Sequence, residues 1–283
     1  MRLSCLPVSF FSDIIEGRLS VAEWAQMGKD IGLDGIDLSI LFVPDRSAGA
    51  VSALRQEIER AGIELVMITS YPDFTHPDRA QRARELALEQ EVVRVSAGLG
   101  AQYVRVTAGQ AHPETERQLG IEWAVDGLSR LVETTADLGV TLVYENHGKP
   151  GAWEYTDFSQ PPDIFLDIVA QTANTGLRVN FDVGNAAAFA DDPVALLERV
   201  VSRVETVHAA DTAVRGDLQH VLLGTGVTPY PALFEKLRTH KWDGWICMEE
   251  NARMGRDGVV RAAEYIRTTW DESRLSGDEY GMY

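Results

Sequence analysis

The chain has 283 residues, of which 45% are apolar and 24% charged, and this ordinary globular composition excludes a disordered, collagen-like or disulfide-scaffolded protein. Its 26 basic and 43 acidic side chains give a formal net charge of −17, which opposes binding to nucleic acid. The two cysteines, Cys5 and Cys247, lie in apolar stretches, as is typical of reduced thiols in the cytoplasm.

Two features of the chain favour a soluble, cytoplasmic protein. The uncharged segment at residues 3–12 has no small-residue cleavage site, so it does not resemble a secretory signal. No later apolar run is long enough to span a bilayer. We therefore expect no membrane partner.

Eight short apolar or β-branched runs alternate along the chain with eight longer segments of helical periodicity. The predicted strands cover residues 3–8, 35–39, 63–70, 103–107, 141–145, 177–182, 205–209 and 244–249. The predicted helices cover residues 20–31, 48–61, 79–99, 116–138, 162–173, 193–200, 230–239 and 258–271. Glycines such as Gly32 and Gly100 stand where a helix would end before a strand, a position that favours a left-handed cap.

Eight strand–helix units predict an α/β fold made of a single (β/α)8 TIM barrel. A Rossmann or flavodoxin-like sheet explains only five or six such units, and no G-x-G-x-x-G motif follows the first strand. No linker of biased composition divides the chain, so we expect residues 1–273 to form the barrel and residues 274–283 a C-terminal tail. The long connection at 147–161 is a candidate lid.

Acidic and imidazole residues end the last four predicted strands: Glu145, Asp182, His208 and Glu249. The chemistry of such barrels is carried by residues at the carboxyl ends of the strands. Each of the four follows an apolar run, so converging carboxylates would be partly desolvated, and a divalent cation would neutralise them. The alternative is that each residue only ends its strand, solvated or paired with an arginine. Four such residues on consecutive strands favour the metal site.

The segments around these residues resemble the xylose isomerase-like TIM barrel superfamily. The shared motifs are Glu-Asn-His at 145–147, Phe-Asp-x-Gly-Asn at 181–185, His-x-x-Asp at 208–211 and Gly-Trp-x-x-x-Glu at 244–249. Its members include ketose 3-epimerases, hydroxypyruvate isomerase, inosose dehydratase and the apurinic-site endonucleases. The resemblance covers essentially the whole chain, and it is specific for the fold and the metal rather than for the substrate.

The resemblance implies one divalent ion, Mn²⁺ first and Mg²⁺, Co²⁺ or Zn²⁺ next, bound by Glu145, Asp182, His208 and Glu249. In the isomerase and epimerase members the ion polarises a keto sugar, so that the adjacent C–H becomes acidic and an enediolate forms. Glu145 and Glu249 would be the catalytic pair that removes and returns the proton. Asp211 is a candidate partner that fixes the tautomer of His208.

Five further residues are candidate substrate-binding residues: Asn185, Arg215, His147, Trp153 and Arg105. Asn185 stands where the ketose epimerases commonly place a histidine, and its amide can bind a hydroxyl. Arg215 either contacts sugar hydroxyls, as an epimerase arginine near that point does, or is a solvated loop residue. Trp153 either covers the apolar face of a sugar or packs its loop onto the barrel. Arg105 ends a strand, and His147 is either a site group or a loop histidine.

We therefore expect a divalent-metal-dependent isomerase or epimerase that acts on a keto sugar or related polyol ketone through an enediolate. A dehydratase of the inosose type, or a lyase acting on a 3-keto glycoside, would start with the same proton abstraction and is the alternative. An apurinic endonuclease needs a basic groove and more histidine ligands, which the net charge of −17 and six histidines oppose. A noncatalytic sugar-binding subunit is a further alternative. Because family members are often dimers or tetramers, a homo-oligomer is compatible with the resemblance.

Overall fold

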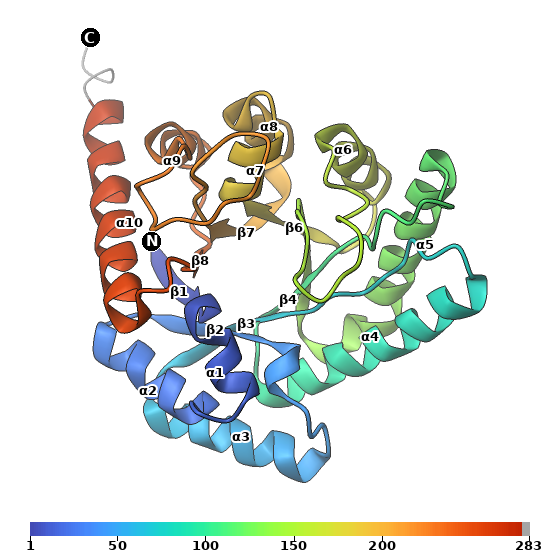
Figure 1. Cartoon of the computed structure of the whole chain (residues 1–283), viewed down its shortest axis with the longest axis horizontal. Helices are drawn as coiled ribbons and strands as arrows, with labels where there is room; N and C mark the ends of the chain where they lie inside the picture. Colours follow the sequence, from blue (N-terminus) through green and yellow to red (C-terminus); the bar gives the residue numbers. More distant parts are fainter. Residues whose placement is uncertain (279–283) are drawn as a thin grey trace.

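The computed structural model describes the backbone of residues 1–278 and the side chains of residues 1–273. Its eight parallel strands are β1 (Arg2–Leu6), β2 (Gly35–Ser39), β3 (Glu64–Thr69), β4 (Tyr103–Val106), β5 (Thr141–Glu145), β6 (Arg178–Asp182), β7 (Val204–Ala209) and β8 (Trp245–Glu249). They form one sheet in the order β1-β8-β7-β6-β5-β4-β3-β2. The predicted α/β barrel is confirmed (Figure 1).

β1 and β2 stand at the two ends of this order, and side chains join them into a nearly closed barrel. The backbone N–H of Leu3 donates to Asp34 Oδ2 and the N–H of Asp34 donates to the Leu3 carbonyl, both at 2.9 Å. Deeper in the barrel, Ser4 Oγ donates to Asp37 Oδ2 at 2.6 Å. The seam is therefore held by three hydrogen bonds outside a regular strand ladder.

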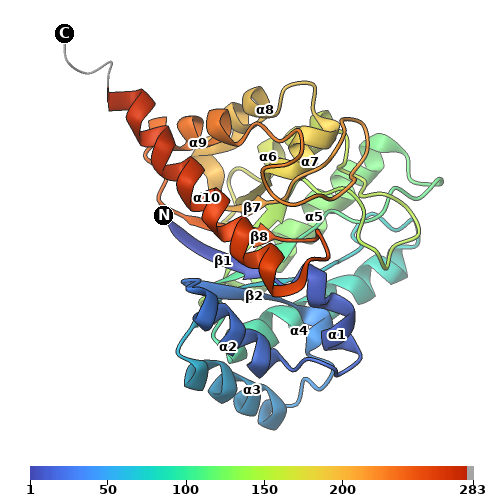
Figure 2. The same ribbon diagram turned by 60° about the vertical axis from the view of Figure 1, so that its left-hand side comes forward.

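A ring of helices packs around the outside of the sheet (Figures 1 and 2). The main helices are α2 (Val21–Ile31), α3 (Ala48–Ala61), α4 (Arg79–Leu99), α5 (Arg117–Thr135), α6 (Pro162–Gln171), α8 (Pro193–Val200), α9 (Tyr230–Thr239) and α10 (Gly255–Asp278). Short helical segments follow several strands or helices: η1 (Val8–Phe10), α1 (Phe11–Ile15), η2 (Ile40–Phe42), η3 (Ala136–Leu138), α7 (Val183–Phe189) and η4 (Val201–Arg203).

Local sequence explains why the helices begin and end where they do. Ser20 and Glu23 form a capping box at the start of α2, and Gly32 ends the helix in the left-handed conformation with φ of 83°. α10 continues to Asp278, so residues 274–278 of the expected tail are helical, while residues 279–283 lie outside the described residues. Within the described part of the chain, no helix combines the length and the apolar character that a bilayer crossing requires.

Strand alternation divides the side chains between the two faces of the sheet. One set packs under the helices in the main core, which includes Ile36, Val104 and Leu142. The other set points into the barrel, where a second apolar cluster that includes Tyr103 and Trp245 lies at the amino-terminal ends of the strands. The barrel interior is therefore plugged at one end, and polar side chains occupy the other.

Candidate metal centre

The period of two along each strand brings four predicted metal ligands to the same end of the barrel interior. On β8, Trp245 and Cys247 face the interior, so Glu249 two residues further on follows them. On β5, Val143 precedes Glu145 in the same way. The local alternation of each strand thus aims its last polar residue inward at the carboxyl end.

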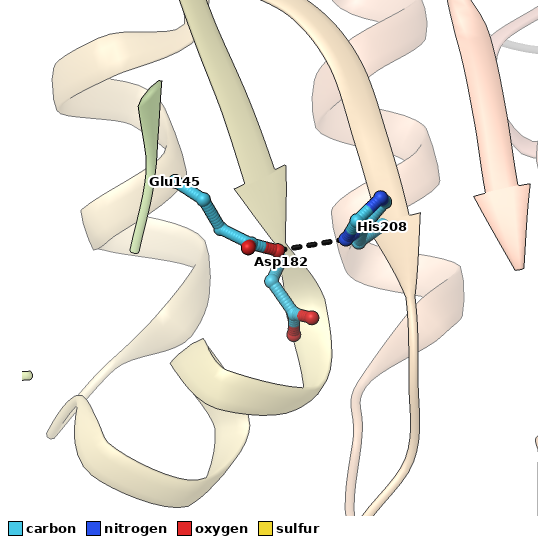
Figure 3. Close-up of side chains that lie close together, drawn as sticks. All are labelled: Glu145, Asp182 and His208. Atoms are coloured by element: carbon cyan, nitrogen blue, oxygen red, sulfur yellow. Dashed lines mark hydrogen bonds and ion pairs between the residues drawn. The ribbon is translucent and has the colours of Figure 1, made fainter. Parts of the chain in front are cut away.

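Three of these side chains form a compact, fully buried group. Ligand atoms of Glu145, Asp182 and His208 all lie within 4.8 Å of one another, and none of the three residues is exposed. The ladder between β6 and β7 sets Asp182 directly opposite His208. Figure 3 shows the three side chains close together, with a dashed line joining Glu145 to His208. Glu145 Oε1 is 2.7 Å from His208 Nδ1.

Glu249 completes the set from the next strand, at the more accessible side. Its Oε1 lies 3.1 Å from His208 Nδ1, and 15% of its side chain is exposed, against none for Glu145. Glu249 therefore adjoins the buried group through His208 and is partly exposed, and metal binding by all four residues stays a prediction.

The donor set fits a divalent cation. Asp182 Oδ2 is buried without a hydrogen-bond partner among the described residues. Ligand atoms about 2.1 Å from an octahedral ion are about 3 Å from each other, which matches the separations of 2.7 and 3.1 Å around His208 Nδ1. Three carboxylates and one imidazole suit Mn²⁺, Mg²⁺ or Zn²⁺.

Without a cation, the three carboxylates of this group lie beside the His208 imidazole, and burial and neighbouring charges shift their pKa values. Burial, reinforced by the charges of Glu145 and Glu249, raises the pKa of Asp182 well above its ordinary value. Burial opposes ionisation of Glu249 too, but His208 outweighs it and lowers the pKa of that carboxyl to about 2. Burial would lower the pKa of His208, yet Glu145 and Glu249 raise it well above its ordinary value. A bound cation would satisfy all three carboxylates at once.

Arg105, expected to bind substrate, lies against the metal centre. Its Nε is 3.0 Å from Glu145 Oε2, its Nη1 donates to the Ser70 carbonyl at 2.9 Å, and its guanidinium stacks on the Tyr71 ring at 4.8 Å. The side chain is 1% exposed. Burial would raise the pKa of Glu145, but Arg105 and His208 outweigh it and keep the pKa lowered. In this structure Arg105 keeps Glu145 ionised and oriented, and contact of Arg105 with a substrate stays a prediction.

Asn180 and Thr206 support the same carboxylate, and sequence reasoning missed both. Asn180 Nδ2 donates to Glu145 Oε1 at 3.0 Å, and Thr206 Oγ1 donates to Asn180 Oδ1 at 2.8 Å. Both residues are fully buried. Their position on the strands is the signal that could have identified them: each lies two residues before a predicted metal ligand and so faces the same side.

The backbone around Asp182 fixes its orientation. Asp182 caps the short helix α7, and its Oδ1 accepts the Asn185 N–H at 2.6 Å. The Asn146 side chain bridges to the Asp182 backbone, donating to its carbonyl at 2.8 Å and accepting its N–H at 2.9 Å. One carboxylate oxygen is thus occupied by the helix cap, and Oδ2 is left for an ion.

Asp211 does not support His208, and that expectation is wrong. Its carboxylate instead accepts four backbone N–H groups, from Thr212, Gly224, Gly226 and Thr228, at 2.9 to 3.1 Å. A Cβ on Gly226 would approach Asp211 Oδ1 to 2.3 Å, so the turn closes tightly on the carboxylate. Gly224 and Gly226 therefore belong to a turn that is built around the Asp211 carboxylate.

The connection at 147–161 is attached to the loop after β4 in this structure, and its role as a lid stays a prediction. Gln110 Oε1 accepts the N–H groups of Glu154 and Tyr155, and the Phe158 N–H donates to the Gly109 carbonyl at 2.8 Å. Trp153 is half-buried at the outer turn, where its N–H donates to the Pro150 carbonyl. These contacts attach the loop after β5 to the loop after β4, and contact of Trp153 with a substrate stays a prediction.

The remaining predicted substrate residues occupy different places. Arg215 is exposed, and its Nη2 donates to the carbonyls of Ala190 and Asp191, both at 2.6 Å, away from the four ligands. His147 lies at the centre, with Nε2 4.0 Å from Glu145 Oε2, and burial lowers its pKa to about 4. Asn185 is buried at the start of α7. The structure therefore brings His147 to the centre and not Arg215.

The sequence matches a family model described as the xylose isomerase-like TIM barrel over residues 25–269. Inosose dehydratase of Geobacillus kaustophilus (strain HTA426) is 24% identical over 282 residues, covering 88% of this chain and 86% of that protein. L-ribulose-5-phosphate 3-epimerase UlaE of Escherichia coli (strain K12) is 22% identical over 288 residues, covering 96% of this chain and 95% of that protein.

Solved structures show the same fold at low identity. A D-tagatose 3-epimerase-like protein superposes with a TM-score of 0.79 at 18% identity, covering 98% of this chain and 99% of that chain. The IolI protein, whose structure holds a zinc atom, superposes with a TM-score of 0.78 at 15% identity, covering 96% of this chain and 99% of that chain. At these identities the likenesses show the fold alone.

Proposed function

Because this chain belongs to the xylose isomerase-like TIM barrel family, we propose that its buried carboxylate–histidine group is the centre of a divalent-metal-dependent enzyme. Its reaction is the isomerisation or epimerisation of a keto sugar or related polyol ketone through an enediolate. The observation that carries this proposal is the convergence of Glu145, Asp182 and His208 within 4.8 Å, beside Glu249. The sugar epimerases among its relatives support the same reaction class.

Glu145, Asp182, His208 and Glu249 would hold the ion, with Mn²⁺ expected first. When bound, it would supply Lewis acidity that stabilises negative charge on the substrate oxygens. The zinc atom in the related IolI structure supports metal binding by this fold. We further expect a cytoplasmic enzyme with a small-molecule partner, compatible with a homo-oligomer and without nucleic acid or membrane partners.

Proton transfer would fall to Glu145 and Glu249, whose environments differ. Glu249 is 15% exposed and has His208 as its charged neighbour, so it can reach a substrate carbon at the opening. Glu145 is fully buried, and both of its oxygens are engaged, Oε2 by Arg105 and Oε1 by His208 and Asn180. We therefore assign the first proton abstraction to Glu249; in an epimerisation, Glu145 would take up a proton and deliver it to the opposite face of the enediolate.

The same asymmetry favours a second candidate function, a dehydratase. Elimination of water needs one base for the C–H proton and an acid for the leaving hydroxyl, and does not need two equivalent carboxylates. The 24% identity with inosose dehydratase supports this reaction class. Both functions begin with removal of a proton next to a carbonyl, so a single experiment can address them.

The test is solvent exchange with the Mn²⁺-loaded protein. Keto sugars and inososes are incubated in D₂O, and products are analysed by mass spectrometry and NMR. Deuterium at the carbon next to the carbonyl, abolished by a chelator, is the expected result. A product of unchanged composition apart from deuterium identifies an isomerase or epimerase, and loss of water identifies a dehydratase. No exchange with any member of the panel would contradict both functions.

Variants then separate the two carboxylates. Glu249→Gln should slow exchange by about 10²–10⁴-fold, the usual contribution of a general base. Glu264→Gln, an exposed residue on α10, is the matched control and should exchange at the wild-type rate. Metal content is measured for each variant, because a Glu249→Gln protein that retains its ion and its exchange rate would show that another group takes the proton.

A further inference from the structure

A cavity of about 10 Å³ lies beside His147, between the loop that follows β5 and the helices α6, α7 and α8. His147 and Asn185 line it on the strand side, and Phe165 and Phe189 line it on the helix side. A cavity needs a volume of roughly 10–15 Å³ to hold one water molecule. Its size therefore corresponds to a single water.

Two buried polar atoms at this cavity need a partner. His147 Nδ1 and Asn185 Oδ1 are both buried, and neither has a hydrogen-bond partner among the residues that the structure describes. A Cβ on Gly148 would lie 2.8 Å from Asn185 Oδ1, so this oxygen is directed toward the segment that carries His147. A buried polar atom without a hydrogen-bond partner destabilises the folded protein. One small polar molecule between the two atoms would give each of them a partner.

The other edge of the imidazole faces the metal centre. His147 Nε2 is 4.0 Å from Glu145 Oε2, beyond hydrogen-bond distance, and 13% of the side chain is exposed. The ring thus has one nitrogen at the cavity and one at the centre. Whatever binds in the cavity decides which nitrogen carries the proton.

We propose that the cavity binds one ordered water molecule, which accepts a hydrogen bond from His147 Nδ1–H and donates one to Asn185 Oδ1. Ser159 also lines the cavity, and its hydroxyl hydrogen is already given to Asp157 Oδ1 at 2.7 Å. Ser159 Oγ can therefore only accept, as Asn185 Oδ1 can. Both hydrogens of the water go to these two oxygens, so its lone pairs face the imidazole and require a proton on Nδ1.

This arrangement gives His147 and Asn185 distinct roles. The neutral imidazole presents Nε2, without its proton, to the metal centre as a hydrogen-bond acceptor. Asn185 is a positioning residue that acts on His147 through the water, rather than a substrate contact. The inference concerns the cavity alone, so it stands or falls separately from the reaction proposed above.

Nitrogen NMR of the imidazole ring tests the proposal. The protein is ¹⁵N-labelled and loaded with diamagnetic Mg²⁺ at about pH 8, where an ordinary imidazole is neutral. The His147 signal is identified by its loss in His147→Gln. The Nδ1–H tautomer is expected in the wild type and in the control Phe189→Leu, which enlarges the cavity without changing its polar atoms. An Nε2–H tautomer in the wild type would overturn the proposal.

Variants of Asn185 test its part. Asn185→Leu removes the acceptor and should shift the ring to the other tautomer or to a mixture, whereas Asn185→Asp retains an acceptor and should preserve Nδ1–H. An unchanged tautomer in a folded Asn185→Leu protein would overturn the role of Asn185. If that variant does not fold, a high-resolution crystal structure of the Mg²⁺-loaded wild type decides. Density for a water between His147 and Asn185 is expected, and a dry cavity would refute the proposal.

Discussion

Replacing Arg105 by methionine tests whether the metal centre depends on a buried ion pair. The guanidinium Nε lies 3.0 Å from Glu145 Oε2, and the two side chains are 1% and 0% exposed. At that separation two unit charges attract by about 5.5 kcal/mol with an effective dielectric constant of about 20. Removing one partner of a buried pair costs about 3–5 kcal/mol, because the other charge remains buried. We expect Arg105→Met to lower the free energy of unfolding of the metal-free protein by that amount.

Urea unfolding, followed by far-UV circular dichroism with and without saturating Mg²⁺, measures this loss. The ion would supply positive charge to Glu145, so the loss should be smaller in the metal-loaded protein. Arg105→Lys is the matched variant: it retains the charge, but one ammonium cannot serve both Glu145 and the Ser70 carbonyl as the guanidinium does, so an intermediate loss is expected. A loss below about 1 kcal/mol in metal-free Arg105→Met would refute the reasoning.

Three further predictions concern separate parts of the molecule. Burial raises the pKa of Glu89 to about 7, so this carboxyl favours folding most below its unfolded pKa and loses that contribution as the pH rises through 7. Glu89→Gln should therefore be more stable than the wild type at pH 8, by about 3 kcal/mol at most, with no gain at pH 4; the exposed control Glu57→Gln should show no such trend in urea unfolding. Asp211→Ala should accelerate amide hydrogen exchange at Gly224 and Gly226, because their acceptor is lost, and unchanged exchange there would contradict the structure. Mn²⁺ at about 100 times its dissociation constant should stabilise the protein by about 2.7 kcal/mol in thermal unfolding, and an unshifted wild-type transition would count against the metal centre.

The strand and helix pattern was readable from local sequence in most places. The predicted ranges 35–39 and 141–145 coincide with β2 and β5, and 48–61 and 79–99 coincide with α3 and α4. Apolar runs and capping residues are local signals, so they can be recognised without knowing the neighbours in space. α7 was missed because its seven residues are mostly alanine and glycine and directly follow a strand, without the periodic pattern of a longer helix.

The residues that orient the predicted ligands were harder to predict from the sequence, because their positions depend on contacts between strands. Asp211 has the right spacing to assist His208, yet its carboxylate accepts three N–H groups from residues 224–228 and a fourth from Thr212. Arg105 was recognised as a residue of the pocket, but its partner lies on the next strand, 40 residues away. Contacts between side chains on neighbouring strands depend on strand register and on closure of the barrel, and local sequence patterns do not reveal either.

By itself, the sequence determined the barrel and the four polar residues at the ends of its last strands, because alternation along a strand and the end of an apolar run are properties of contiguous residues. Only the tertiary structure decided how those residues differ. It sealed Glu145 between Arg105 and Asn180, left Glu249 at the opening, and placed His147 between the centre and a small cavity. The physical reason is that burial and charge pairing are set by neighbours on adjacent strands, and these neighbours meet only when the barrel forms.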